Sequence, residues 1–391
     1  MMGERPATAT FGRLSPLVVG VLGGSAFAVL SLLSAWRGRT STVTMPAAYL
    51  WLVTYDHGFI KRGLVGTLAT ALAGGSAVDF MTVLRWHTIV TFVVVVSLAA
   101  WLGLVVAQSG SRAAAWLVFF VGALAAAAHT FPTLLLAVGY LDPFIILFVI
   151  ACALLMARGH LLAASIVGVI GTVAHETFVV LWAVLAVLAF ALVSGTGSSL
   201  RRGWVLVLPF LSGAAVMLAN NPDAGAAEIR SLGFPPDVTQ NLTSAPFHET
   251  LVSAWFTMLP GHALYWRFEL VAVIIFAGPA ALAAALYLWS RWGQLTRAEA
   301  VAVLVAAVVP CLVVILASDT SRFLVRSPVM VLITVLVLES RRRPPPRMNR
   351  AVGIMVVVAC IAWLAMPRMY WYTGIPFGGT EVLSILGILH G

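Results

Sequence analysis

Four short polar clusters stand at the edges of otherwise apolar segments of this chain. They are residues 56–63 (DHGFIKRG), residues 139–142 (GYLD), the pair His175-Glu176, and residues 318–322 (SDTSR). Ionisable side chains are costly inside a membrane, and where they recur they usually mark a binding site or a pathway. Hydropathy places all four clusters on the same, outer side of the apolar segments. The sequence therefore predicts one shared polar cavity that faces outward.

The first cluster combines a carboxylate with two cations. If residues 52–64 form a helix, Asp56 lies within an apolar stripe and its carboxylate needs a partner from another helix, while His57 and Lys61 lie on a separate polar face. One interpretation makes Asp56 a general base and lets Lys61 and Arg62 hold a phosphate, because arginine suits bidentate contact and lysine adds a point charge. The alternative is a structural ion pair with an interfacial basic anchor.

The next two clusters also allow two interpretations each. His175 and Glu176 could share a proton, but one histidine and one glutamate are too few for a zinc site, and no HExxH sequence is present. The alternative is a polar pair that breaks a helix and hydrogen-bonds to its neighbours. Asp142 precedes Pro143 at the start of an apolar run, where an ordinary helix cap is the alternative to substrate binding.

The last cluster places an acid and an arginine at the start of one apolar segment, and Arg326 lies one turn further on. Asp319 and Arg322 are three residues apart, so a local salt bridge is one interpretation. In the other, Arg322 and Arg326 bind an anionic head group at the mouth of the helix.

Composition sets the class of protein in which these clusters act. The 391 residues are 61% hydrophobic and 9% charged, with a mean hydropathy of +1.02, whereas a soluble domain carries about 25% charged residues. Repeated apolar runs of about 20 residues predict helices that cross about 30 Å of hydrocarbon. A membrane barrel would need alternating segments of about ten residues, and none is seen. We therefore predict an all-α, polytopic membrane protein with a single transmembrane helical domain over residues 1–391.

We expect about eleven spanning helices. Their predicted ranges are 14–35, 86–107, 114–131, 143–157, 161–175, 177–194, 203–219, 267–289, 299–317, 323–339 and 350–366. The net charge of +9 is concentrated in the inner loops, which predicts a cytoplasmic N-terminus and an outer C-terminus, not a nucleic-acid partner. The three cysteines lie in apolar runs and indicate neither a disulfide framework nor a metal site.

Two outer segments are long. Residues 36–85 include a short apolar piece that is predicted to be an amphipathic or re-entrant helix. Residues 220–266 include a predicted interfacial helix at about 246–259, whose apolar residues recur at helical spacing while His248 and Glu249 point elsewhere.

These motifs together suggest a family. The run Gly58-Phe59-Ile60-Lys61-Arg62-Gly63, the acid that opens a span at Asp142, the His175-Glu176 pair and residues 319–322 resemble a group of bacterial multi-spanning envelope-polysaccharide proteins. More broadly, the layout of most of the chain resembles the GT-C glycosyltransferases and the Wzy-type polymerases.

The resemblance implies a sugar donor linked to polyprenyl phosphate or diphosphate, a glycan or glycolipid acceptor, and chemistry at the outer face of the bacterial cytoplasmic membrane. In GT-C enzymes an acidic residue in the first outer loop acts as the base, and Asp56 matches it by position. The acidic pair of many GT-C families is absent, since His57 follows Asp56.

The polar clusters and the family resemblance predict the same mechanism. Asp56, with His175 or Glu176, removes the proton from the acceptor hydroxyl, and cations stabilise the leaving phosphate. The predicted cations are Lys61, Arg62, Arg322 and Arg326. The other predicted substrate-binding residues are His57, Asp142, Asp319, His248 and Glu249. No nucleotide motif is found, and neither a metal nor a cofactor is expected.

Three alternatives to a transferase stay open: a Wzy-like polymerase, a transporter or flippase of lipid-linked sugars, and a non-catalytic assembly protein. Transport predicts polar groups that continue toward the inner face, whereas the middle positions of the predicted spans are almost all apolar.

Overall fold

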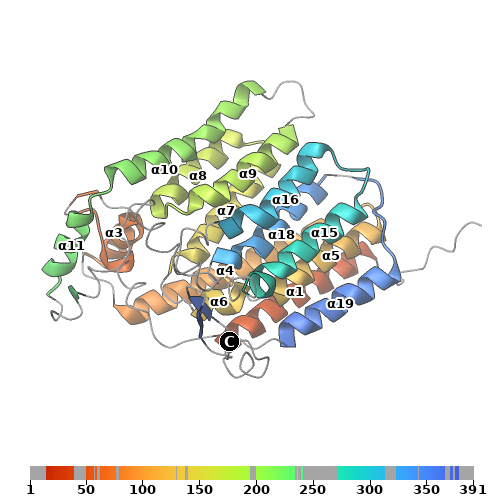
Figure 1. Cartoon of the computed structure of the whole chain (residues 1–391), viewed down its shortest axis with the longest axis horizontal. Coiled ribbons are helices and arrows are strands. Elements are labelled where there is room, and N and C mark those ends of the chain that lie inside the picture. The colour runs from red at the N-terminus through yellow and green to blue at the C-terminus, as the bar shows by residue number, and fades with distance from the viewer. Residues whose placement is uncertain are drawn as a thin grey trace, which may run out of the picture.

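The structure, a computed structural model, describes most of the chain (Figure 1). The described residues are 15–38, 50–56, 58–59, 62–75, 79–128, 130–136, 140–193, 200–233, 236, 239–240, 272–312, 323–341, 343–365, 370–372 and 375–377. They are helical with connecting turns, apart from one short antiparallel hairpin. The predicted all-α class is therefore confirmed.

The helices, in chain order, are α1 (Pro16–Gly38), α3 (Gly63–Leu72), α4 (Phe80–Ala107), α5 (Arg112–Ala127), α6 (Thr130–Leu136), α7 (Asp142–Ala157), α8 (Leu161–Ala174), α9 (Phe178–Val193), the 3₁₀ helix η1 (Leu200–Val207), α10 (Leu208–Ala219), α11 (Pro222–Ser231), the π-helix η3 (Val273–Ala277), α15 (Gly278–Ser290), α16 (Arg297–Leu312), α18 (Arg326–Glu339) and α19 (Arg350–Ala365). Strands β1 (Tyr370–Tyr372) and β2 (Ile375–Phe377) form the hairpin.

Local capping chemistry fixes where the long apolar helices begin. Asp79 precedes α4, and its carboxylate accepts hydrogen bonds from the backbone N–H of Thr82 at 2.9 Å and from the Thr82 hydroxyl at 2.6 Å. Ser111 precedes α5 and accepts from the N–H of Ala114 at 3.2 Å. Such caps satisfy N–H groups that the first turn of a helix leaves without partners. The helices accordingly begin at residues that the local sequence selects.

Helix α18 lies at the centre of the bundle. Every one of its residues is buried, and it contacts α5, α7, α9, α15 and α16. A helix that is apolar on all sides is stable only when other elements surround it. Its ends are charged, since it begins at Arg326 and ends at Glu339, about 20 Å apart at 1.5 Å per residue. The two ends of α18 therefore organise two separate polar clusters.

The outer faces of several helices expose large apolar side chains. They include Leu17, Val21 and Leu22 of α1, Ile89 and Phe92 of α4, and Ile354, Met355, Val358 and Ile361 of α19. By length and composition, two helices of the described chain, Met81–Ala107 and Val273–Ser290, are long and apolar enough to cross a membrane, while other apolar helices are 10–17 residues long. The eleven crossings and their orientation stay predictions.

The two long predicted outer segments meet at one end of the bundle, where α3 and α11 lie (Figure 1). Residues 50–53 are buried and pack with Ile229 of α11 in a small separate core. Backbone also joins the two segments, because the N–H of Asn221 donates to the carbonyl of Phe59 at 3.0 Å. At Gly66 of α3 an added Cβ would lie 2.0 Å from the carbonyl oxygen of Val53. A glycine is therefore required at this contact.

The helix considered for residues 52–64 is wrong. Helical conformation ends at residue 52, the chain turns, and α3 begins only at Gly63. Gly58 has a φ of +125° and Arg62 a φ of +71°, and neither value is compatible with a right-handed helix. Asp56 is consequently exposed in a turn and does not lie on a buried apolar face. The short helix predicted in the segment 36–85 is present as α3.

Candidate functional site

Five of the predicted site residues lie together at the end of the bundle where α18 begins. Helix ends position them: Asp142 is the first residue of α7, His175 and Glu176 lie between α8 and α9, Arg62 immediately precedes α3, and Arg326 is the first residue of α18. We refer to these five residues together with Thr177 as the His175 cluster.

A buried ion pair forms the innermost part of the His175 cluster. Nε of Arg326 donates to Oδ1 of Asp142 at 2.9 Å, and Nη2 donates to the same oxygen. Both side chains are about 1% exposed, and the ring of Phe323 lies 4.5 Å from the Arg326 guanidinium. Asp142 makes no side-chain cap, because Leu141 is the N-cap residue of α7 and no side-chain hydrogen bond closes that end. The cap interpretation of Asp142 is therefore wrong.

Thr177 connects this ion pair to the histidine. Nη1 of Arg326 donates to the Thr177 hydroxyl at 3.0 Å, and that hydroxyl lies 3.0 Å from Nδ1 of His175. The backbone N–H of Thr177 donates to the same Nδ1 at 3.3 Å. Because Nδ1 accepts this hydrogen bond, the neutral imidazole that fits the site carries its proton on Nε2. The ring orientation of His175 thus depends on Thr177 and, through it, on Arg326.

A second ion pair lies closer to the surface. Nε of Arg62 donates to Oε2 of Glu176 at 2.8 Å, and Nη2 donates to Oε1, so the contact is bidentate. The two side chains are 14% and 10% exposed. Oε2 of Glu176 also lies 3.5 Å from Nδ1 of His175. Of the two arginines in the His175 cluster, Arg62 is the more accessible.

The other predicted site residues are placed differently. Asp56 is exposed, and within the described residues its carboxylate has no ion pair or side-chain hydrogen bond. Six predicted residues lie outside the residues that the structure describes: His57, Lys61, His248, Glu249, Asp319 and Arg322. The interfacial helix expected at about 246–259 lies outside them as well.

Sequence reasoning missed several polar residues at this end. Thr177 directly follows the predicted pair, and that adjacency was the signal for it. His87 is fully buried, with Nε2 2.8 Å from the carbonyl oxygen of Leu134. Thr54 donates to the carboxylate of Glu228 at 3.0 Å, and both are buried. This last contact fixes α11 onto the segment that carries Asp56.

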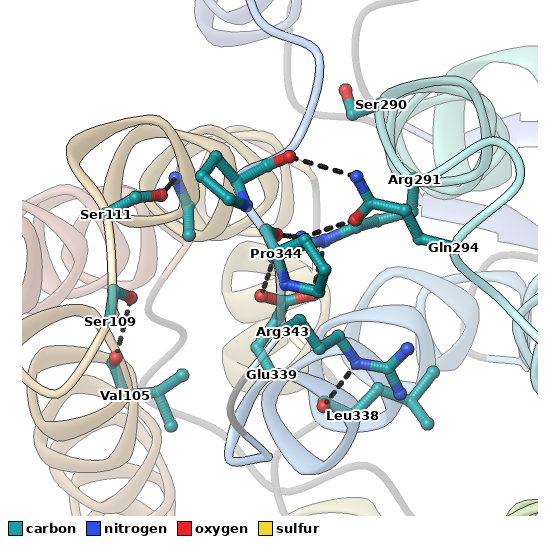
Figure 2. Close-up of polar contacts among 12 residues, drawn as sticks. Val105, Ser109, Ser111, Ser290, Arg291, Gln294, Leu338, Glu339, Arg343 and Pro344 are labelled. Atoms are coloured by element: carbon teal, nitrogen blue, oxygen red, sulfur yellow. Dashed lines mark hydrogen bonds and ion pairs between the residues drawn. The ribbon is translucent and has the colours of Figure 1, made fainter.

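A different set of polar residues surrounds the other end of α18, and we call it the Glu339 cluster (Figure 2). Its members are Tyr287, Arg291, Gln294, Glu299, Glu339 and Arg343. Nε of Arg291 donates to Oε1 of Glu339 at 2.9 Å and Nη2 donates to Oε2, while the Tyr287 hydroxyl donates to Oε1 at 2.7 Å. Arg291 also donates to Gln294 and to the carbonyl of Pro344. Both carboxylate oxygens of Glu339 accept hydrogen bonds, and Nε, Nη1 and Nη2 of Arg291 all donate to groups of the protein.

The loop after α18 is held to this cluster by a further ion pair. Arg343 donates to the carboxylate of Glu299 and, through Nε, to the carbonyl of Leu338 at 3.1 Å. Burial works against the charge of Arg343, but the hydrogen bond and the attraction of Glu299 outweigh it, and the pKa of the guanidinium lies above its ordinary value. A small hollow beside the loop is lined by residues that include Arg291, Glu339 and Arg343 of the cluster itself. The ion pairs join the end of α15, α16 and α18, so the cluster is a structural joint with a small hollow at its side.

Neither cluster resembles a metal centre. Among the described residues, no group of three or more histidine, cysteine, aspartate or glutamate side chains is placed to hold a metal ion. In comparisons with known proteins, no family model, no curated protein and no solved structure matches this chain. The resemblance to GT-C glycosyltransferases and Wzy-type polymerases therefore remains a prediction from the sequence.

Proposed function

We propose that this protein is a membrane glycosyltransferase of the bacterial cell envelope. It takes a sugar from a polyprenyl-phosphate carrier at the outer face of the cytoplasmic membrane and transfers it to a glycan or glycolipid acceptor. The observation that carries the proposal is the His175 cluster, in which two arginines, two carboxylates and a histidine from four separate places in the sequence meet at one end of the bundle. Arginine suits a phosphate leaving group, and histidine or a carboxylate suits proton removal.

The proposed topology is a GT-C-like bundle of about eleven membrane crossings, with the N-terminus in the cytoplasm and the C-terminus outside. The exposed apolar faces of α1, α4 and α19 support it, because soluble monomers rarely expose such extended apolar surface. Among the described residues, Arg326 and Asp142, predicted to be outside, and Arg291, predicted to be in an inner loop, also lie at opposite ends of α18. In this arrangement the His175 cluster is outside and the Glu339 cluster is at the cytoplasmic face.

The proposed reaction forms one bond and breaks one. The oxygen of an acceptor hydroxyl attacks the anomeric carbon of the donor sugar, and the bond from that carbon to the phosphate oxygen breaks. The lipid phosphate leaves with the electron pair, and Arg62 stabilises its charge. The hydroxyl proton passes to a carboxylate or to the imidazole, for which Asp56, His175 and Glu176 are the candidates. Lys61, Arg322 and Arg326 are the other proposed phosphate ligands.

Transport is supported less well than transfer. A pathway for a polar head group needs polar groups along its length. Between Ser327 and Glu339, the buried helix α18 carries Thr334 as its sole polar residue. The central helix thus supports chemistry at one face of the bundle over passage through it.

The direct test uses purified protein with a polyprenyl-phosphate sugar and a cell-envelope glycan fraction as acceptor. Release of polyprenyl phosphate together with labelled glycan is the expected result. Release that is independent of acceptor, or movement of the intact donor across vesicle membranes, would contradict transferase activity. Asp56→Asn at full turnover would remove Asp56 from the role of base and leave His175 and Glu176.

A further inference from the structure

The two arginines of the His175 cluster differ in what a ligand can reach. Arg326 and Asp142 are both about 1% exposed, and Arg326 also donates to Thr177. Arg62 and Glu176 are 14% and 10% exposed. A ligand that arrives from the surface therefore meets the Arg62–Glu176 pair first.

Glu176 occupies the face of Arg62 that would bind a phosphate. The guanidinium presents two parallel N–H groups to the carboxylate, and the same fork fits two oxygens of a phosphate. The carboxylate and the phosphate consequently compete for one site. The exchange keeps both charges paired, because the guanidinium leaves one anion only as it takes up another, and the 14% and 10% exposure of the two side chains lets an anion approach from the surface.

If a phosphate displaces Glu176 from Arg62, the freed carboxylate lies next to His175. Its Oε2 lies 3.5 Å from Nδ1 of His175, and the Thr177 hydroxyl lies 3.0 Å from the same nitrogen. When Arg62 turns to another anion, the carboxylate of Glu176 stays beside the imidazole as a proton acceptor.

We infer that Arg62 exchanges Glu176 for the phosphate of the donor, and that the displaced Glu176 is the base of the transfer reaction. This inference rests on the proposed function. The acceptor hydroxyl gives its proton to the Glu176 carboxylate while its oxygen bonds to the anomeric carbon. The phosphate leaves with the electron pair of the broken bond and remains on Arg62. Donor binding and activation of the base are thereby a single event.

The test measures affinity apart from turnover. Polyprenyl phosphate and inorganic phosphate are titrated separately into the detergent-solubilised protein by calorimetry. Glu176→Gln removes the competing charge and is expected to bind either probe about two- to fivefold more tightly. Arg62→Gln is expected to bind about tenfold or more weakly. In the transfer assay, Glu176→Gln is expected to lose turnover although it binds the phosphate better.

Glu299→Gln is the matched control, because the Arg343–Glu299 pair is 10% and 7% exposed and lies at the other end of the bundle. It should leave phosphate affinity unchanged. Glu176→Gln that binds no more tightly than wild type, with transfer intact in the wild type, would overturn the exchange and leave the transferase standing. The tighter binding of inorganic phosphate without any binding of lipid phosphate would keep the exchange and overturn the transferase. No binding of either probe would overturn both.

Discussion

The two ends of α18 carry the same chemistry in different surroundings. At the Glu339 end, a buried arginine uses both oxygens of one carboxylate, and a tyrosine, a glutamine and a backbone carbonyl take the remaining positions. At the Arg326 end, the buried pair continues through Thr177 to a histidine and then to a partly exposed second pair. Both ends continue to a second, partly exposed pair, Arg343–Glu299 at 10% and 7% and Arg62–Glu176 at 14% and 10%. Among the described residues, however, the network at the Arg326 end includes a histidine beside that pair, and histidine can take up or release a proton near neutral pH. This difference makes the His175 cluster the better candidate site.

The largest expected effect comes from breaking either buried pair. Glu339→Gln leaves Arg291 without its carboxylate, and Asp142→Asn does the same to Arg326. Each is expected to lower the free energy of unfolding by about 3–5 kcal/mol, because an uncompensated charge stays buried. Thermal unfolding of the purified variants in one detergent measures this change.

Glu339→Gln and Asp142→Asn are expected to differ in transferase activity. Per folded molecule, Glu339→Gln should retain activity within about twofold, while Asp142→Asn should lose about tenfold or more, because Thr177 and His175 depend on Arg326 for their orientation. Equal activity in both variants would contradict the assignment of different roles to the two ends. In the double variant Asp142→Leu/Arg326→Met, stability should largely return, since no charge remains buried, but activity should not.

A smaller effect is expected where the outer segments pack without charges. Gly66→Ala would place a methyl group 2.0 Å from the carbonyl oxygen of Val53, so α3 must shift, at about 1–3 kcal/mol. Gly203→Ala is the control, because its added Cβ would meet nothing within 4 Å. If the two variants unfold at the same temperature, the close approach of α3 to residue 53 is not required.

The sequence was sufficient for most helices and for part of the site. Apolar runs alone predicted helices over 86–107 and 114–131, close to α4 and α5, but the caps Asp79 and Ser111 begin these helices at Phe80 and Arg112, earlier than hydropathy alone indicated. Around residues 52–64 the apolar spacing suggested a helix, but the positive φ values of Gly58 and Arg62 overrode it. Tertiary contacts of the chain decide such backbone conformations.

Which residues belong to the site was easier to predict from the sequence than which of them form ion pairs with each other. The separate clusters were expected to meet; four residues of the first three clusters do, together with Arg326, while residues 318–322 lie outside the described part of the chain. Which residue bonds to which was not predicted, because Arg326 and Asp142 are 184 positions apart and Arg62 and Glu176 are 114 apart. A single sequence contains no periodic signal over such distances. For the same reason, Arg62 and Arg326 were predicted as phosphate ligands without the carboxylates that now compete for them.

The more accessible pair is expected to contribute less to stability than the buried one. Arg62→Gln should lower the free energy of unfolding by less than Asp142→Asn does, since Arg62 and Glu176 are 14% and 10% exposed whereas Arg326 and Asp142 are about 1% exposed. The measurement is thermal unfolding of wild type and variant at low and high salt. A loss of stability as large as that of Asp142→Asn would show that the Arg62–Glu176 pair is needed for folding, and that Arg62 cannot exchange Glu176 for a phosphate.

The smallest expected effect concerns the cap of α4. Hydrogen bonds from the hydroxyl and the N–H of Thr82 lower the pKa of Asp79 below its ordinary value of 3.8. A carboxylate whose pKa is lower in the folded state stabilises the fold above the unfolded pKa, and this contribution is lost as the pH falls through the folded pKa. Asp79→Asn keeps a capping side chain but does not titrate. The unfolding temperature of the wild type should therefore exceed that of the variant near neutral pH, and the difference should shrink as the solution is acidified below pH 3.8. A difference that stays constant with pH would show that the Asp79 cap does not depend on its charge.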